Sequence, residues 1–409
     1  MAIGEEVLPE FNQVSGVRVG VACAGIKVAG RKDLVIFELA EGSNTAGVFT
    51  QNRFCAAPVT VAKNHLASCS PRYLVINTGN ANAGTGEQGM NDALVCCARV
   101  AESANALAAK VVKEQVLPFS TGVIGEPLPV NKLLAAIPGC MENLADNQWA
   151  SAAEGIMTTD TRPKGATRKV MVNGVPLSLS GISKGAGMIC PDMATMLAFV
   201  ATDAIISVHA LNGLLARAVD KSFNRISVDG DTSTNDACIL TATGQTGHEL
   251  IEGTPEFAEF ERVFTGLMIE LAQAIVKDGE GATKFVEVNV VQSNSADSAL
   301  KIAYAIAHSP LVKTALFASD PNWGRILAVV GRAGVADLQI DKVNIYLGEL
   351  CIVSDGARCP DYTEESGVKA MSDDCLTIRV ELGLGDMAES VWTTDLSHDY
   401  VTINAEYRT

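Results

Sequence analysis

The chain alternates short apolar, β-branched stretches with longer stretches of helical periodicity. The first pattern predicts strands and the second predicts helices. We expect strands at residues 16–24, 33–38, 73–77, 169–172, 176–181, 195–201, 237–243 and 285–291, and over much of the last seventy residues. We expect helices at residues 92–110, 130–136, 148–157, 208–223, 255–277, 297–307 and 322–330. Because strands and helices mix without strict βαβ order, the pattern favours an α+β or layered sandwich fold.

One turn can be predicted from its own residues. Asn173-Gly174 lies between two strand patterns, and this dipeptide is typical of a type I′ hairpin turn. The hairpin leads directly into the glycine-containing segment that starts at Lys184. We therefore expect the residues after Lys184 to lie on a rigid support.

Composition narrows the class of protein. With 409 residues, of which 48% are hydrophobic, the chain can bury a large core and form two or three domains. Asp and Glu number 47 against 31 Lys and Arg, and the net charge of −16 disfavours nucleic acid and anionic membranes as partners. The start lacks a secretory pattern and no apolar run has membrane-spanning length, so we expect a cytoplasmic protein.

Cysteine and histidine spacing does not indicate a metal site. The eleven cysteines contain no C-x-x-C pair, and the five histidines contain no H-x-x-x-H pair. We expect reduced, mostly buried cysteines and no bound metal.

Thr195 is the candidate nucleophile, because it lies between a glycine-rich loop and an apolar strand pattern. A threonine hydroxyl needs an adjacent base, and its own α-amine can serve once the Ala194-Thr195 bond is cut. An α-amine has a pKa of about 7.7–8.0, so a substantial fraction is neutral near pH 7.5. The sequence thus favours a self-processing enzyme with an N-terminal threonine.

A family resemblance rests on this segment. The residues Lys184-Gly-x-Gly-Met-Ile-x-Pro-x-Met-Ala-Thr195-Met-Leu, followed by Thr202-Asp203-Ala204, resemble the self-cleavage segment of ornithine acetyltransferases. These enzymes are also called bifunctional glutamate N-acetyltransferases of arginine biosynthesis. The resemblance extends from residues 42–50 to residues 400–409, and one departure is Asp192, where the family usually has Asn.

The resemblance implies a fold and a domain organisation. It implies a four-layer α-β-β-α sandwich over residues 1–285 and a smaller C-terminal α/β domain over residues 286–409, whose tail returns to the active site. Cleavage would open a strand at the centre of a sheet. The two fragments, residues 1–194 and 195–409, would stay together and pair into a heterotetramer of two α and two β fragments.

The resemblance also implies site residues. A tetrahedral oxyanion needs donors aimed at the developing charge. Taken alone, residues 119–125 are typical of an ordinary turn, but Thr121 and Gly122 match the family's oxyanion hole. The matching substrate-binding residues are Thr158, Lys184, Thr195, Glu280, Asn404 and Thr409. Lys184 suits an α-carboxylate, and Glu280 suits the distal ammonium of ornithine.

The predicted activity is acetyl transfer from N-acetylornithine to glutamate, which releases ornithine and N-acetylglutamate without a metal or organic cofactor. One alternative adds acetyl-CoA as a second donor. Another is a self-processing aminopeptidase or amidase, and a third is an uncleaved, non-catalytic relative. These alternatives stay open at the level of sequence.

Three other segments suggest different chemistry. Residues 77–89 are glycine-rich before a helix but lack the P-loop ending, so we interpret them as a loop and helix entry. Residues 229–236 are acidic but lack the closing Glu of a calcium loop, so we interpret them as a strand connection. Residues 320–325 are typical of a helix entry, and we expect Trp323 and Arg325 to hold the C-terminal domain against the core.

Overall fold

The computed structural model describes residues 2–4, 7–190 and 196–406. The chain forms two compact units. The first, here the sandwich unit, contains residues 7–224 and 231–275. The second, here the C-terminal unit, contains residues 1–6, 225–230 and 276–409. The sequence pattern did not indicate that residues 225–230 leave the first unit for the second.

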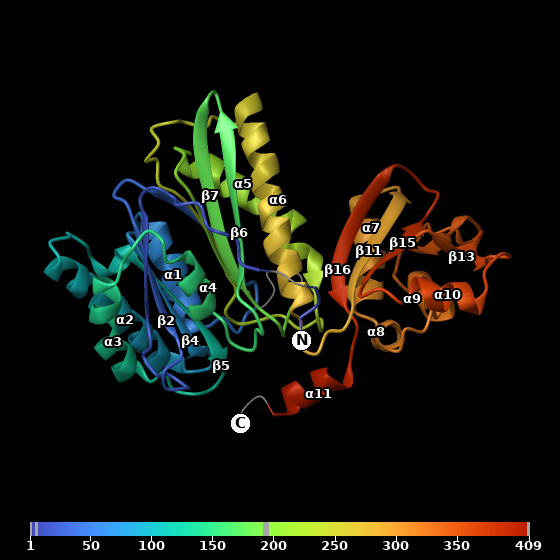
Figure 1. The fold of residues 1–409 in the computed structure, drawn as a ribbon, viewed down its shortest axis with the longest axis horizontal. Helices are drawn as coiled ribbons and strands as arrows, with labels where there is room; N and C mark the ends of the chain where they lie inside the picture. The colour runs from blue at the N-terminus through green and yellow to red at the C-terminus, as the bar shows by residue number, and fades with distance from the viewer. Residues whose placement is uncertain (1, 5–6, 191–195, 407–409) are drawn as a thin grey trace. The chain divides into compact units, whose positions relative to one another are not determined.

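Two sheets form the centre of the sandwich unit (Figure 1). The four-stranded sheet has the order β1 (Val17–Ala22), β2 (Leu34–Leu39), β4 (Tyr73–Asn80), β5 (Val116–Val123). The five-stranded sheet has the order β3 (Asn44–Phe49), β10 (Ala237–Ala242), β8 (Leu197–Thr202), β7 (Val175–Lys184), β6 (Lys164–Val172).

The two sheets share one apolar core. Strands of both sheets contribute buried side chains to it. Phe199 of β8 stacks on Phe37 of β2 with ring centroids 5.6 Å apart, and it meets Phe119 of β5 edge-on at 5.1 Å. Such aromatic pairs stabilise beyond their buried area. The faces that meet here are therefore fixed by packing.

Helices cover the outer faces of the sandwich. On the four-stranded sheet, α2 (Gly86–Ala106) and α3 (Val130–Glu142) form a second core with residues of β2, β4 and β5. On the other sheet, α5 (Val208–Lys221) packs against β3 and β10, and Ser183 of β7 donates to the Leu271 carbonyl of α6 (Pro255–Lys277). Two shorter helices, α1 (Ala57–Ser68) and α4 (Trp149–Gly155), complete the unit. The predicted α-β-β-α sandwich is confirmed.

Helix α3 is longer than its sequence predicts. The predicted helix ends at residue 136, before Pro138, whereas α3 continues to Glu142. A proline inside a helix leaves the carbonyl four residues earlier without its usual donor. Here that carbonyl belongs to Leu134, and Arg99 donates to it through Nε at 3.3 Å. A neighbouring helix thus supplies the missing donor.

The predicted hairpin is confirmed. Val172 of β6 pairs with Val175 of β7, and Asn173 and Gly174 have φ of +49° and +79°, as a type I′ turn requires. Strand β7 then ends at Lys184. Strand β8, which begins at Leu197, is the central strand of its sheet, and the predicted first strand residue, Thr195, lies outside the described residues.

The C-terminal unit contains a mixed seven-stranded sheet (Figure 1). Its order is β14 (Ala357–Arg358), β13 (Leu350–Ser354), β12 (Asn344–Leu347), β15 (Cys375–Glu381), β11 (Phe285–Ser293), β16 (Met387–Thr394), β9 (Ile226–Ser227). Its helices are α7 (Ala296–Ala307), α8 (Pro310–Phe317), α9 (Trp323–Gly331), α10 (Glu364–Ala370) and α11 (His398–Ala405). Helix α9 starts as predicted, with Asn322 as its N-cap.

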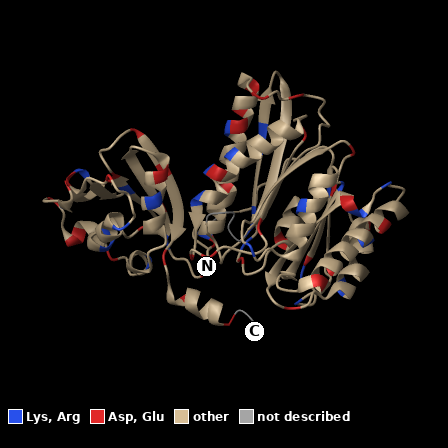
Figure 2. Cartoon of the chain, turned by 180° about the vertical axis from the view of Figure 1, so that it is seen from behind, with Lys and Arg blue, Asp and Glu red and all other residues tan. Residues whose placement is uncertain are grey.

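The helices of both units carry charged residues of both signs. In Figure 2, both acidic and basic residues occur along α6, which has Glu256 in its first turn and Lys277 in its last. No helix within the described part of the chain is both long and apolar enough to cross a membrane. Over the same residues, no three His, Cys, Asp or Glu side chains are grouped so that they could hold a metal ion.

Candidate active site

Three predicted site residues meet at the end of β7. The Lys184 ammonium, whose residue is only 3% exposed, donates to Thr158 Oγ1 at 2.8 Å and to Thr121 Oγ1 at 3.3 Å. Thr158 follows α4, and Thr121 lies near the end of β5. Residues far apart in the sequence thus place two hydroxyls and one ammonium at a single point.

A buried carboxylate organises this point. Asp160 accepts hydrogen bonds from the Thr158 N–H at 2.9 Å, the Gly185 N–H at 2.8 Å and the Lys164 ammonium at 2.6 Å. Burial raises the pKa of Asp160, but the charges of Lys164 and Lys184 outweigh burial and hold this pKa well below its usual range. Asp160 is therefore ionised and fixes the backbone on both sides of the Lys184 side chain.

The segment with Thr121 and Gly122 is strand, not the turn that its residues alone predict. It forms the end of β5, which runs parallel to β4 with Thr78 opposite Thr121. Gly122 has φ of +132°, and a Cβ there would clash with the Gly79 backbone and lie 2.6 Å from the Asn80 nitrogen. Only glycine fits both conditions, because an L side chain would be strained and crowded.

The loop before the predicted cleavage site is bent. Gly185 has φ of +150°, as expected for a glycine that permits an unusual backbone, and Met188 has φ of +56°. A long side chain in the left-handed region is uncommon and indicates a constrained backbone. The predicted cleavage residues Ala194 and Thr195 lie outside the described residues.

A second group of predicted residues meets inside the C-terminal unit. Asn404 of α11 donates through Nδ2 to Glu280 Oε2 at 2.8 Å, and Glu280 is 9% exposed. Ser397 donates to the Gly281 carbonyl at 2.6 Å, and a Cβ on Gly281, whose φ is +67°, would clash with the Tyr400 nitrogen. The chain after β16 is thus tied to the Glu280 loop, and Thr409 lies outside the described residues.

Asp395 strengthens this tie. Its carboxylate accepts from the Thr283 N–H at 2.8 Å, the Thr283 hydroxyl at 2.6 Å and the Lys284 N–H at 2.9 Å. Buried Lys313 donates to Thr393 Oγ1 at 3.0 Å and to the Thr394 carbonyl next to it. The conformation of the Glu280 loop therefore depends on the end of β16.

Sequence reasoning gave no role to Asp160 and Lys164, although they are central to the first group. Asp160 lies in the segment that contains Thr158, and Lys164 follows four residues later, where β6 begins. An acidic and a basic residue at this spacing usually form an exposed pair. Only their burial in the fold distinguishes Asp160 and Lys164 from such an exposed pair.

The four-layer sandwich is the architecture that the family resemblance implies, and the structure places the Thr121-Gly122 strand end beside buried Lys184. The ArgJ family profile matches residues 18–409, and the chain belongs to the ArgJ family. It is 54% identical over 411 residues to the arginine biosynthesis bifunctional protein ArgJ of Pseudomonas fluorescens, with 100% of both chains covered. It is 55% identical over 397 residues to the protein of the same name from Methylococcus capsulatus, covering 97% of this chain and 96% of that one.

A solved structure is also similar. The arginine biosynthesis bifunctional protein ArgJ from Bacillus halodurans is 36% identical, covers 50% of this chain and 95% of its own, and has a TM-score of 0.48. The full-length relatives and the family match confirm the family predicted from the Lys184–Leu197 segment.

Proposed function

We propose that the protein cuts itself between Ala194 and Thr195 and then transfers the acetyl group of N-acetylornithine to glutamate. The single observation that carries this proposal is the meeting of Lys184 with Thr121 and Thr158. The reaction needs a cation that binds the substrate carboxylate and donors that stabilise the oxyanion. Here the cation, Lys184, lies next to the Thr121-Gly122 strand end. Membership of the ArgJ family supports the same activity.

In the proposed self-cleavage, Thr195 Oγ attacks the Ala194 carbonyl carbon. The C–N bond breaks as the nitrogen gains a proton, which leaves an ester, and water then opens the ester to give a carboxyl end at Ala194. The new α-amine of Thr195 is the base for the following reaction. Negative charge on the carbonyl oxygen is stabilised by the Thr121-Gly122 strand end.

In the proposed transfer, Thr195 Oγ attacks the acetyl carbon of N-acetylornithine. The α-amine takes the hydroxyl proton and gives it to the ornithine nitrogen as the C–N bond breaks. Ornithine leaves, and an acetyl ester remains on Thr195. The amine of glutamate then attacks the ester carbon and loses a proton, which the α-amine passes to Oγ as the ester C–O bond breaks. N-acetylglutamate leaves, and the enzyme is restored.

Substrate selection is proposed to involve both groups of residues. Lys184 pairs with the α-carboxylate, which N-acetylornithine and glutamate share, while Thr158 orients the Lys184 ammonium. Glu280 pairs with the distal ammonium, which only the ornithine compounds have, and Asn404 and Thr409 complete the site. We further propose a cytoplasmic heterotetramer of two α and two β fragments that needs no metal or organic cofactor.

Mass spectrometry of the purified protein tests the first step. We expect two polypeptides, the second beginning with Thr195. Thr195→Ala should abolish both cleavage and transfer, and Thr195→Ser should retain some of each. A single unbroken chain in an active preparation, or an active Thr195→Ala variant, would refute the mechanism.

Two assays separate the alternative activities. Ornithine release that depends on glutamate supports the transferase, whereas release without glutamate indicates an amidase. Formation of N-acetylglutamate from glutamate and acetyl-CoA alone would show a second donor. An acetyl adduct on the Thr195 fragment, trapped with N-acetylornithine before glutamate is added, would support the covalent step.

A further inference from the structure

The loop at residues 232–236 contacts both halves of the candidate site in the sandwich unit. Asn235 contacts the residue before Thr121-Gly122, and Asp236 contacts the residue after Thr195. The sequence suggested only an acidic connection between strands here. The contacts of these two neighbours indicate a more specific role.

Asn235 holds the strand end that carries Thr121 and Gly122. Its Nδ2 donates to the Ser120 carbonyl at 2.9 Å and to the Ala81 carbonyl at 2.6 Å, while its Oδ1 accepts from the Thr234 hydroxyl at 2.6 Å. Two carbonyls can only accept, so the orientation of the amide is fixed by its partners. A carboxylate in this place would face two carbonyl oxygens.

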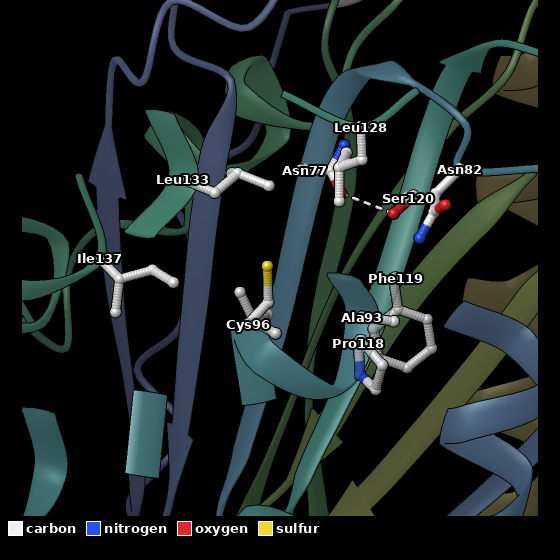
Figure 3. Close-up of a pocket in the computed structure, with 11 residues that line it drawn as sticks. Asn77, Asn82, Ala93, Cys96, Pro118, Phe119, Ser120, Leu128, Leu133 and Ile137 are labelled. Atoms are coloured by element: carbon white, nitrogen blue, oxygen red, sulfur yellow. Dashed lines mark hydrogen bonds between the residues drawn. The ribbon is translucent and has the colours of Figure 1, made fainter. Parts of the chain in front are cut away.

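Ser120 also lines a small cavity, together with Asn77 and Asn82 (Figure 3). Its volume is about 10 Å³, which is room for about one water molecule. The Ser120 hydroxyl donates to Asn77 Oδ1 at 2.5 Å beside this cavity. Ser120 is thus held through its hydroxyl by β4 and through its carbonyl by Asn235, and the cavity leaves room for movement if either contact is lost.

Asp236 holds the start of the central strand. Its Oδ1 accepts from the Met196 N–H at 2.9 Å, and the N–H of the next residue, Ala237, donates to the Met196 carbonyl at 3.2 Å. Asp236 is 1% exposed, and its Oδ2 has no hydrogen-bond partner among the described residues. Burial raises the pKa of Asp236 well above its usual range.

The loop itself is anchored to the end of β3. The Thr50 hydroxyl donates to the Ser233 carbonyl at 2.7 Å, the Thr50 N–H donates to the Asp236 carbonyl at 3.0 Å, and the Ala56 N–H donates to the Thr234 carbonyl at 3.0 Å. Asn235 and Asp236 therefore project from a fixed backbone rather than from a free loop.

We infer that Asn235 and Asp236 are positioning residues that fix the distance between the oxyanion-stabilising strand end and the start of the nucleophile strand. The inference rests on the proposed function, because it assigns Thr195 and Thr121-Gly122 their roles. The two side chains do not touch the substrate. A displacement of about 1 Å between reacting groups can lower a rate about 100-fold.

The test measures self-cleavage and acetyl transfer in the full chain carrying Asn235→Asp, Asp236→Ala or Asp236→Asn. The matched control is Asp203→Ala. Asp203 is also buried and accepts a backbone N–H, that of Ser178 at 2.8 Å, but it follows the opposite end of β8. Asp203→Ala and Asp236→Ala therefore each leave one buried N–H unpaired.

We expect Asn235→Asp and Asp236→Ala to lower kcat about 10- to 100-fold, with KM for N-acetylornithine changed less than about threefold. Self-cleavage should slow in the same variants. Asp236→Asn keeps a side-chain oxygen that can accept from the Met196 N–H, so it should restore kcat to within about threefold of wild type. Asp203→Ala should lower the urea midpoint as Asp236→Ala does, without this loss of kcat.

Three results would overturn the inference while leaving the proposed function intact: full activity in Asn235→Asp and Asp236→Ala, equal loss in Asp203→Ala, or no rescue by Asp236→Asn. A wild-type protein that cuts itself but transfers no acetyl group would refute the proposed function. The self-cleavage rates of the variants would then show whether Asn235 and Asp236 are positioning residues. A wild-type protein that does neither would refute both.

Discussion

Replacing Asp160 by Asn tests whether one buried charge holds the Lys184 group together. The side chains of Asp160 and Lys164 are 0% and 1% exposed. The carboxylate accepts from three donors: Oδ1 binds the Lys164 ammonium and the Gly185 N–H, and Oδ2 binds the Thr158 N–H. An amide has only one oxygen, so in either orientation its NH₂ faces at least one of these donors.

The expected loss of stability is large. Removing one partner of a buried ion pair costs about 3–5 kcal/mol, because the other charge stays buried without compensation. The unpaired Thr158 N–H, which alone costs about 1–3 kcal/mol, is part of this loss. Domains are stable by only about 5–15 kcal/mol in total, so the variant should unfold at much lower urea concentration.

A second substitution separates charge from hydrogen bonding. In Asp160→Asn/Lys164→Met both charges are gone, and replacing a whole buried pair is often neutral. We expect the double variant to recover most of the lost stability, to within about 2 kcal/mol of the parent. In a chain that keeps Thr195, acetyl transfer by the double variant should stay low, because the amide oxygen cannot replace both carboxylate oxygens that accept from the Thr158 and Gly185 N–H groups.

The assay is urea unfolding followed by circular dichroism, in a Thr195→Ala background so that every variant is one uncut chain. Glu154→Gln is the control, because its pair with Lys32 is 49% and 40% exposed and should contribute less than about 1 kcal/mol. An Asp160→Asn variant within about 1 kcal/mol of its parent would refute the role of the buried charge.

The same pair predicts a pH dependence. The pKa of Asp160 is lower in the folded chain than its unfolded value of about 3.9. The unfolded state therefore binds more protons below that value, so this stabilisation is complete above pH 5 and decreases as the pH falls through 4. Asp160→Asn should lose this part of the acid sensitivity, and an unchanged acid-unfolding curve would contradict the assignment.

Three further predictions concern other positions. Gly122→Ala should abolish cleavage and transfer, because the added Cβ would clash with the β4 backbone. Gly125→Ala is the control: Gly125 has φ of +82° but no atom within 4 Å of an added Cβ, so this variant should lose about 1 kcal/mol of unfolding free energy and keep activity. Burial lowers the pKa of Lys313 to about 8, so the C-terminal unit should gain up to about 3 kcal/mol of stability as the pH rises from 8 to 10.5, and Lys313→Met should remove this slope. Glu280→Gln should raise KM for N-acetylornithine about 10-fold or more and leave KM for glutamate unchanged, since only the donor has a distal ammonium; equal effects on both would exclude that role.

The sequence predicted elements well where local pattern and packing agree. The helix at 255–277 begins with proline, keeps one apolar face and is observed with the predicted bounds. Helix α1 was missed, because Pro58, Val59 and Val61 have low helix propensity and the helix depends on tertiary packing. In the last seventy residues, α10 and α11 interrupt what the pattern predicts to be mainly strand.

The site could be predicted only as far as the resemblance named its residues. Composition and spacing gave no reason to bring Thr121, Thr158 and Lys184 together. Their contact depends on how the two sheets pack, because β5 and β7 belong to different sheets. The roles of Asp160 and Asp236 depend on buried environments: neighbouring lysine charges hold the pKa of Asp160 well below its usual range, whereas burial raises the pKa of Asp236. Sequence alone does not distinguish these environments.

The hydrogen bonds that organise the sandwich-unit site use no atom of the peptide bond that is proposed to break. Asp236 accepts from the Met196 N–H, which belongs to the peptide bond after Thr195, and Asn235 donates to Ser120 and Ala81. Asp160 acts on Thr158 and Gly185. Cutting the Ala194-Thr195 bond removes none of the donors or acceptors of these hydrogen bonds. The Thr121-Gly122 strand end can therefore serve self-cleavage first and acetyl transfer afterwards. Its alignment is set by folding rather than by substrate binding, as electrostatic stabilisation of a transition state requires.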